Sequence, residues 1–232
     1  EYFFPNSNLI TFLQQSPKPF RFMSLDDKIL PPNVSAYYGL ESIEGYDPIY
    51  PRRYEQYIGS LEKGSVELSG PYGFNRIITA HNRLSPLLEF LNIKYVLSLD
   101  EIHDTSLVKV FEEGQTKVYV YTRGNSRAYF AYPIVYEPNE VELLKKMQTT
   151  HEDNTSIAYV IDSIPVPTAP LDQAWMSIKE YSADYMKIET STSQDRFLVI
   201  VNMFTPLSHV AIDGVPQKVY RVNYLFMGVQ VP

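Results

Sequence analysis

The stretch Phe197-Leu198-Val199-Ile200-Val201 is apolar at every position. A short apolar run of this kind, rich in β-branched residues, predicts a strand buried on both faces. Further along, Asp213-Gly214 separates two β-rich runs and indicates a hairpin, because both residues tolerate positive φ. From Trp175 onward strand signals recur roughly every 8–12 residues. This spacing is typical of a β-sandwich or a jelly roll.

The remainder of the second half adds strands and one helix. In residues 185–190 apolar and charged side chains alternate, which predicts a strand with one wet face, and residues 223–231 predict the last strand. Residues 127–132 and 157–161 are also strand-like. Residues 139–147 predict a helix whose apolar side carries Val141, Leu144 and Met147. An extended connector is predicted at the prolines Pro165, Pro167 and Pro170.

The first half mixes helix and strand signals. Pro5-Asn6-Ser7 offers a capping side chain just before Leu9, Ile10, Phe12 and Leu13, whose spacing predicts a short helix. Residues 33–51 are turn-rich and predict an ordered surface loop. Helices are also predicted from Pro51 to residue 61, with the proline at the first helical position, and over residues 85–92. Strands are predicted at residues 20–23 and 93–97 and in a hairpin of residues 107–111 and 117–121.

These signals predict an α+β fold. Residues 1–125 form a mixed α/β subdomain and residues 126–232 a sandwich or jelly-roll-like β subdomain, either as two parts or as one continuous body. The chain opens at Glu1 without a signal peptide and stops at Pro232 directly after a strand-like segment. We therefore expect a processed or excised piece of a longer protein.

Composition excludes several classes of function. The 232 residues carry a net charge of −7 and no cysteine. An acidic chain lacks the basic footprint of a nucleic-acid binder, and without cysteine it has no thiolate metal site. No Gly-x-Ser-x-Gly elbow and no phosphate-cradling glycine loop occurs, and the histidines His81, His103, His151 and His209 are dispersed. We predict no cofactor, no metal and no catalytic residue.

Two groups of acids are candidate reactive sites. Residues 100–104, Asp-Glu-Ile-His-Asp, are rich in metal-ligating atoms, but contiguous turn residues rarely converge on one ion, so a solvated acidic loop is favoured. A pair of carboxylates for glycoside hydrolysis would come from Glu41, Glu44, Asp47 or Glu55. The favoured interpretation is that Asp47-Pro48 begins a turn and that Glu55 faces water.

Tyrosine is the most unusual component. Six of the 19 tyrosines fall between residues 37 and 57, interleaved with two adjacent arginines. Tyrosine rings suit stacking on sugars, and paired guanidinium groups suit an anion. The alternative is that about half of these rings are core and that both arginines pair with glutamates. The candidate glycan or anion surface comprises Tyr37, Tyr38, Tyr46, Asp47, Tyr50, Arg52, Arg53 and Tyr54.

The order of motifs resembles the large extracytoplasmic region of YfhO-like bacterial membrane proteins. The most specific part is the close, where the run of residues 197–200 is followed by Ile212-Asp213-Gly214 and by residues 220–232. Residues 204–209 depart from the family, because the glycine and tryptophan of its usual aromatic-Pro-Gly-Trp turn are missing. Earlier matches are Phe20-Arg21-Phe22, Pro32-Asn33, Tyr38-Gly39-Leu40, residues 43–48, residues 91–97 and residues 127–130.

The resemblance implies a multi-pass protein related to GT-C glycosyltransferases, which use lipid-linked sugars at the outer face of the membrane. This chain would be the extracytoplasmic domain at the cell membrane. It would bind or orient a glycan or a teichoic-acid-like polymer, beside the membrane helices of its parent chain, and would not itself catalyse transfer. The alternatives are an assembly module that packs on the membrane portion or on a partner protein, and a free-standing glycan hydrolase.

Overall fold

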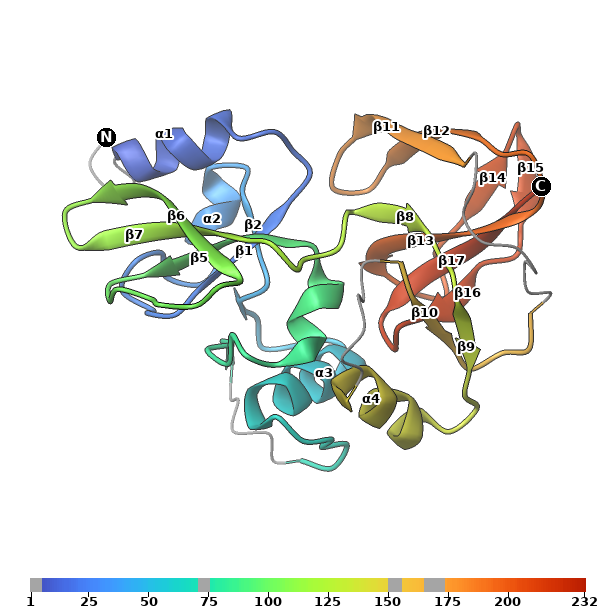
Figure 1. Ribbon diagram of the computed structural model, residues 1–232, viewed down its shortest axis with the longest axis horizontal. Helices are drawn as coiled ribbons and strands as arrows, with labels where there is room; N and C mark the ends of the chain where they lie inside the picture. Colours follow the sequence, from blue (N-terminus) through green and yellow to red (C-terminus); the bar gives the residue numbers. More distant parts are fainter. Residues whose placement is uncertain (1–5, 71–75, 150–155, 165–173) are drawn as a thin grey trace. The chain divides into compact units, whose positions relative to one another are not determined.

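A computed structural model gives the fold of the protein (Figure 1) and describes all residues except 1–5, 71–75, 150–155 and 165–173. The chain divides into two compact units, residues 1–124 and 125–232. Helices and several sheets make a mixed α+β fold that is β-rich in its C-terminal half. The predicted fold class is therefore confirmed. The predicted connector at Pro165, Pro167 and Pro170 lies outside the described residues.

The first unit contains a five-stranded sheet with the order β2-β1-β5-β7-β6. β1 is parallel to both of its neighbours, whereas β7 is antiparallel to β5 and β6. A separate two-stranded pair joins β3 and β4. The strands are β1 (Arg21–Ser24), β2 (Glu41–Ser42), β3 (Gly45–Tyr46), β4 (Ile77–Ile78), β5 (Ile93–Ser98), β6 (Leu107–Glu113) and β7 (Thr116–Tyr121).

Helix α1 (Asn8–Gln15) packs against this sheet and begins as predicted. The Ser7 hydroxyl accepts a hydrogen bond from the Ile10 amide at 3.2 Å. The Glu113 carboxylate accepts from the first helical amides, those of Asn8 and Leu9, at 3.1 and 2.8 Å. An anion at this end of a helix satisfies amides that lack partners within the helix. The apolar side of α1 shares one core cluster with Phe22, Leu97 and Val118.

Two of the predicted helices differ in detail. Helix α3 (Arg52–Lys63) begins one residue later than predicted, so Pro51 is its N-cap and not its first helical residue. Residues 86–91 form η1 (Pro86–Leu91), a 3₁₀ helix and not an α-helix. Asn92 ends η1 in the left-handed conformation and β5 begins at the next residue, so the segment has room only for a short, tight helix.

The predicted loop at residues 33–51 has more structure than expected. It contains the short helix α2 (Val34–Tyr37), strand β2 and strand β3. Leu40 and Ile43 are buried, so the segment contributes to the core and does not simply cross the surface. Its strands are two residues long and pair with distant partners, which leaves no periodic pattern in the sequence.

The second unit is built on a six-stranded sheet with the order β8-β13-β17-β16-β10-β9. β13 pairs with strands on both sides and residues 196–201 are buried, which confirms the interior strand. Gly228 lies opposite Val199, and an added Cβ there would stand 2.5 Å from the Phe197 ring. The strands are β8 (Ala128–Phe130), β9 (Ile134–Tyr136), β10 (Ala158–Val160), β13 (Arg196–Met203), β16 (Tyr220–Val222) and β17 (Phe226–Val231).

Two hairpins supply a second layer. β11 (Trp175–Tyr181) pairs with β12 (Met186–Ser191), and β14 (Val210–Ile212) pairs with β15 (Val215–Gln217). Half-buried apolar side chains of both hairpins pack on one core cluster with β13 and β17. Asp213 and Gly214 have φ of +50° and +83°, so the predicted turn is confirmed.

Helix α4 (Glu140–Thr149) packs beside β10 (Figure 1). Leu144 and Met147 are buried as predicted, together with Leu143. Val141 is exposed, so its assignment to the apolar side was wrong. It lies at the border of the apolar stripe formed by residues 143, 144 and 147, next to the solvent-exposed face of the helix.

The last strand begins at Phe226 and not at residue 223. Asn223 and Tyr224, with φ of +46° and +67°, instead form the turn between β16 and β17. The Asn223 side chain is fully buried; its Oδ1 accepts from the Tyr159 amide at 2.8 Å and its Nδ2 donates to the Tyr129 hydroxyl at 2.9 Å. One residue therefore joins this turn to β8 and β10.

We expect Asn223→Ala to destabilise the second unit by about 2–4 kcal/mol, because two buried groups lose their partners and alanine disfavours positive φ. Asn223→Gly removes the same side chain without the backbone cost, and we expect it to be about 1 kcal/mol less damaging. Urea unfolding followed by fluorescence of Trp175, the one tryptophan of the chain, measures both. Equal losses in the two variants would contradict the backbone part of this explanation.

Candidate functional site

Hydrogen bonds hold the tyrosine-rich segment in place. The Asn33 side chain clamps Tyr46, accepting from its amide at 3.0 Å and donating to its carbonyl. The Tyr54 hydroxyl donates to the Ile43 carbonyl and so ties α3 to the same segment. The Asp47 carboxylate accepts from the Ile49 amide at 2.8 Å and closes a tight turn, as predicted. The exposed residues of this segment are therefore presented on an ordered backbone.

The structure separates the predicted surface residues into exposed and inward-facing ones. Tyr37 and Tyr46 are 68% and 47% exposed. Asp47 and Arg52 are also exposed, whereas Arg53 is half-buried. Tyr38 is buried in the core cluster under α1, with its ring edge-on to Tyr37 at 5.2 Å.

The remaining two tyrosines of the predicted surface are half-buried. Burial raises the pKa of Tyr54, whose hydroxyl is bonded to the backbone. Burial and then the nearby Glu55 carboxylate raise the pKa of Tyr50, whose hydroxyl lies 3.4 Å from Glu55. Both phenols remain neutral at physiological pH, and their hydroxyls have protein partners.

Tyr46 gains a neighbour that the sequence does not indicate. It lies directly opposite Ile77 in the β3–β4 pair, and both side chains are almost half exposed, at 47% and 46%. Opposed residues of a strand pair project to the same side. The Asp47 amide bonds the Arg76 carbonyl at 3.0 Å and extends this pairing. We call Tyr46, Asp47 and Ile77 the Tyr46 surface.

The acidic loop at residues 100–104 is fastened to the sheet. Glu101 accepts from Lys109 at 2.8 Å and from the Tyr119 hydroxyl at 3.0 Å, and the Lys109 bond lowers the pKa of this carboxyl. Asp104 accepts from the Ser106 hydroxyl and amide at 2.7 and 2.9 Å, which lowers its pKa in turn. Among the described residues no group of three acids or histidines is arranged to hold a metal ion.

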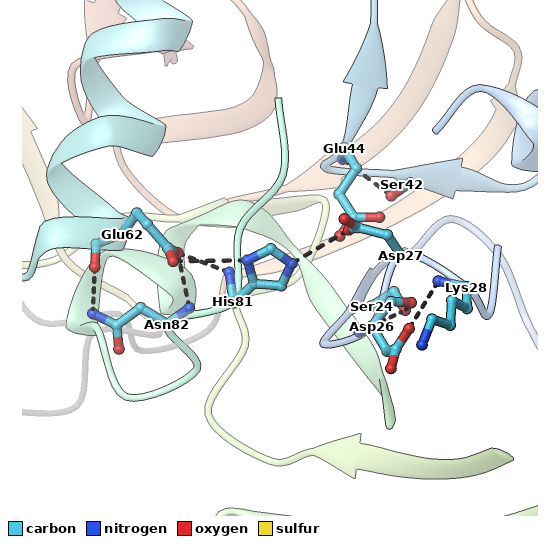
Figure 2. A network of polar contacts seen from close by, with 9 residues as sticks. All are labelled: Ser24, Asp26, Asp27, Lys28, Ser42, Glu44, Glu62, His81 and Asn82. Carbon is cyan, nitrogen blue, oxygen red and sulfur yellow. Dashed lines mark hydrogen bonds and ion pairs between the residues drawn. The ribbon is translucent and has the colours of Figure 1, made fainter. Parts of the chain in front are cut away.

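A polar network that the sequence did not indicate joins three segments of the first unit (Figure 2). His81 Nε2 lies 3.3 Å from Asp27 Oδ1, and His81 Nδ1 lies 3.7 Å from Glu62 Oε1. The other Glu62 oxygen accepts from the amides of His81 and Asn82 at 2.8 and 3.0 Å. The network ties the loop after β1 to the end of α3 and to the segment after β4.

Glu44 lies beside Asp27 in this network (Figure 2) and is 8% exposed. The pKa of its carboxyl is raised from 4.5 to about 8. Burial is the largest cause and the Asp27 charge adds to it, whereas hydrogen bonds with Ser24 and Ser42 act in the opposite direction. Within the described residues its Oε1 has no hydrogen-bond partner. At neutral pH the carboxyl therefore holds its proton, because an ionised form would be desolvated beside a like charge.

The position of Glu44 limits what it can do. It follows β2 as Asp27 follows β1, so the two acids meet because β1 and β2 are parallel neighbours. The unpartnered oxygen is buried, and a general acid must reach the proton acceptor of its substrate. Two other acids of the candidate carboxylate pair have protein partners: Glu41 lies 3.6 Å from Arg21, and Glu55 is 3.4 Å from the Tyr50 hydroxyl. This geometry favours a pH-sensitive structural role for Glu44.

Comparisons with models of known protein families, with curated proteins and with solved structures find no match for this chain. Among the helices of the described ranges, none is long and apolar enough to cross a membrane.

We expect the stability of the first unit to fall as pH rises from about 5 to 9 and expect Glu44→Gln to reduce that fall. Between the unfolded pKa of 4.5 and the folded pKa of about 8 the native state holds a proton that the unfolded state has lost, so each added pH unit costs stability. The slope contributed by one group is at most about 1.4 kcal/mol per pH unit.

Thermal unfolding at several pH values measures this effect. Glu41→Gln is the matched control, since that carboxyl is half-exposed beside Arg21, and we expect it to retain the wild-type slope. Parallel profiles for Glu44→Gln and the wild type would contradict the assignment of a buried, protonated Glu44.

Proposed function

We propose that this chain is an extracytoplasmic domain of a YfhO-like bacterial membrane protein related to GT-C glycosyltransferases. In this proposal it binds or orients a cell-envelope glycan or a teichoic-acid-like polymer and leaves the transfer reaction to the membrane portion of its parent. The order of motifs along the chain supports the family assignment. The observation that carries the binding role is the exposed, backbone-clamped ring of Tyr46 beside Ile77.

The Tyr46 surface has the chemistry that a sugar ring needs. A tyrosine ring offers an apolar face for the C–H side of a sugar, and its hydroxyl offers a polar edge. Ile77 extends the apolar face and the exposed Asp47 supplies carboxylate oxygens that accept from sugar hydroxyls. Because Asn33 fixes the Tyr46 backbone on both its amide and its carbonyl, little conformational entropy is lost on binding.

An assembly module is the second candidate, and one feature favours it. β6 is an edge strand of the five-stranded sheet, and its Val108 and Val110 are 52% and 43% exposed. An edge strand with exposed apolar side chains can pair with or pack on another protein. Lys109 lies between the two valines in sequence, and a lysine on an edge strand disfavours pairing with a strand of another protein. We therefore place glycan binding first.

We expect Tyr46→Ala to weaken binding to purified cell-wall polymer about fivefold to tenfold, because loss of one stacked ring removes about 1–1.5 kcal/mol. The substitution spares the two hydrogen bonds from Asn33, which involve only the Tyr46 backbone. Co-sedimentation with wall fragments that carry or lack teichoic acid provides the measurement.

Tyr185→Ala is the matched control, since Tyr185 is similarly exposed, at 54%, and lies at the turn of the β11–β12 hairpin in the second unit. We expect this variant to bind like the wild type. Equal binding by the Tyr46→Ala variant and the wild type would show that the Tyr46 surface is not the glycan contact. An equal loss of binding in the Tyr46→Ala and Tyr185→Ala variants would also contradict the assignment of the Tyr46 surface as the glycan contact.

A further inference from the structure

A cavity of about 330 Å³ in the first unit is separate from the surfaces described above. It lies between the turn before η1, the start of β6 and the end of β7. Its volume is at the lower end of the range for small-molecule sites. Residues from these three segments line it: Arg83, Leu84, Asp104, Thr105, Ser106, Tyr121, Thr122 and Arg123.

The lining carries two guanidinium groups and one carboxylate, in a chain whose net charge is −7. One carboxylate oxygen of Asp104, Oδ1, already accepts hydrogen bonds from both the amide and the hydroxyl of Ser106. The charges of Arg83 and Arg123 further lower the pKa of this carboxyl, after the Ser106 bonds, so both arginines lie close to it. The cavity therefore holds an ionised acceptor beside two guanidinium groups.

Arg123 is oriented by a buried acid behind the cavity wall. Its Nη2 forms an ion pair with Glu89, which is 2% exposed, whereas the Arg123 side chain is 53% exposed. Burial raises the pKa of Tyr121, which lines the same cavity, and the Glu89 charge raises it further. The Tyr121 phenol thus remains protonated, and the ion pair with Glu89 holds one end of the Arg123 guanidinium in place.

Arg83 has a guanidinium that is available to a ligand. It is half-buried, and in the described part of the chain its guanidinium has no hydrogen bond and no ion pair within 4.0 Å. Its backbone is held in the turn by a bond from its amide to the His81 carbonyl at 2.9 Å. A planar guanidinium presents two parallel donors that match phosphate oxygens, and partial burial strengthens such a bond.

We propose that this cavity binds the phosphate group of a phosphorylated sugar or polyol. Arg83 and Arg123 hold the phosphate oxygens. Asp104 Oδ2 and the hydroxyl oxygens of Thr105 and Thr122 accept hydrogen bonds from the sugar or polyol hydroxyls. The Thr122 hydroxyl itself donates to the Ser106 carbonyl at 3.2 Å. Leu84, 69% exposed at the rim, contacts the carbon skeleton. The site is independent of the Tyr46 surface and uses none of its residues.

Isothermal titration of the full chain with three probes tests this assignment: inorganic phosphate, sn-glycerol 3-phosphate and glycerol. We expect glycerol phosphate to bind more tightly than inorganic phosphate and glycerol alone not to bind. We expect Arg83→Gln to weaken glycerol phosphate binding at least about tenfold, because it removes a charge-assisted pair of bonds. Arg83→Lys keeps the charge without the planar fork and should recover only part of the affinity.

Lys28→Gln is the control, because Lys28 is an exposed cation of the same unit that does not line the cavity. We expect it to bind glycerol phosphate like the wild type. Thermal unfolding of the Arg83 variants shows whether they remain folded. If Arg83→Gln were unfolded, the folded Arg83→Lys and Thr105→Val variants would carry the test, and both should weaken glycerol phosphate binding.

Three outcomes would overturn the proposal. They are failure of both phosphates to bind the wild type, equal affinity of the folded Arg83 variants and the wild type, and equal affinity for inorganic phosphate and glycerol phosphate. The titration uses small soluble probes and Arg83 variants, whereas the polymer test uses wall fragments and Tyr46→Ala. Failure of one experiment therefore leaves the other unaffected.

Discussion

The second unit depends on the buried side chain of Asn223. A turn between two strands of a sheet leaves backbone and side-chain polar groups that must find partners once water is excluded. Asn223 forms three hydrogen bonds at this turn. Its side chain accepts one from the Tyr159 amide and donates one to the Tyr129 hydroxyl, and its own amide donates to the Tyr159 carbonyl at 2.8 Å. Strand β13 and the last strand can pair along their length because this turn fixes where β17 begins.

The first unit also buries a polar side chain, that of Glu44, but without a full set of hydrogen-bond partners among the described residues. Parallel pairing of β1 with β2 places the acids of two successive loops together, and one of them is buried. Burial without a full set of partners is costly for a charge, so Glu44 holds a proton while Asp27 keeps its contact with His81. The nearby turn also supplies Arg83 to the cavity. A short segment thus serves both a pH-sensitive contact and a proposed ligand site.

Local signals in the sequence predicted the elements whose causes are local. The Ser7 cap, the Asp213-Gly214 turn and the apolar run of β13 each depend on neighbouring residues, and each is confirmed. The two-residue strands within residues 33–51 and the turn at Asn223 depend on distant partners, and the predictions there were wrong or incomplete. Residue spacing cannot show such partners, because no period accompanies them.

For the candidate sites, the sequence by itself determined the supply of groups: a cluster of tyrosines, two adjacent arginines, several acids and no cysteine. It also determined the α+β class. Only the tertiary structure decided which groups act together. It placed Tyr38 in the core and left Tyr46 exposed beside Ile77, and it joined Arg83 to Arg123 across 40 residues of chain. The reason is physical, since exposure, pKa and ligand geometry depend on distances in space, and chain folding sets those distances.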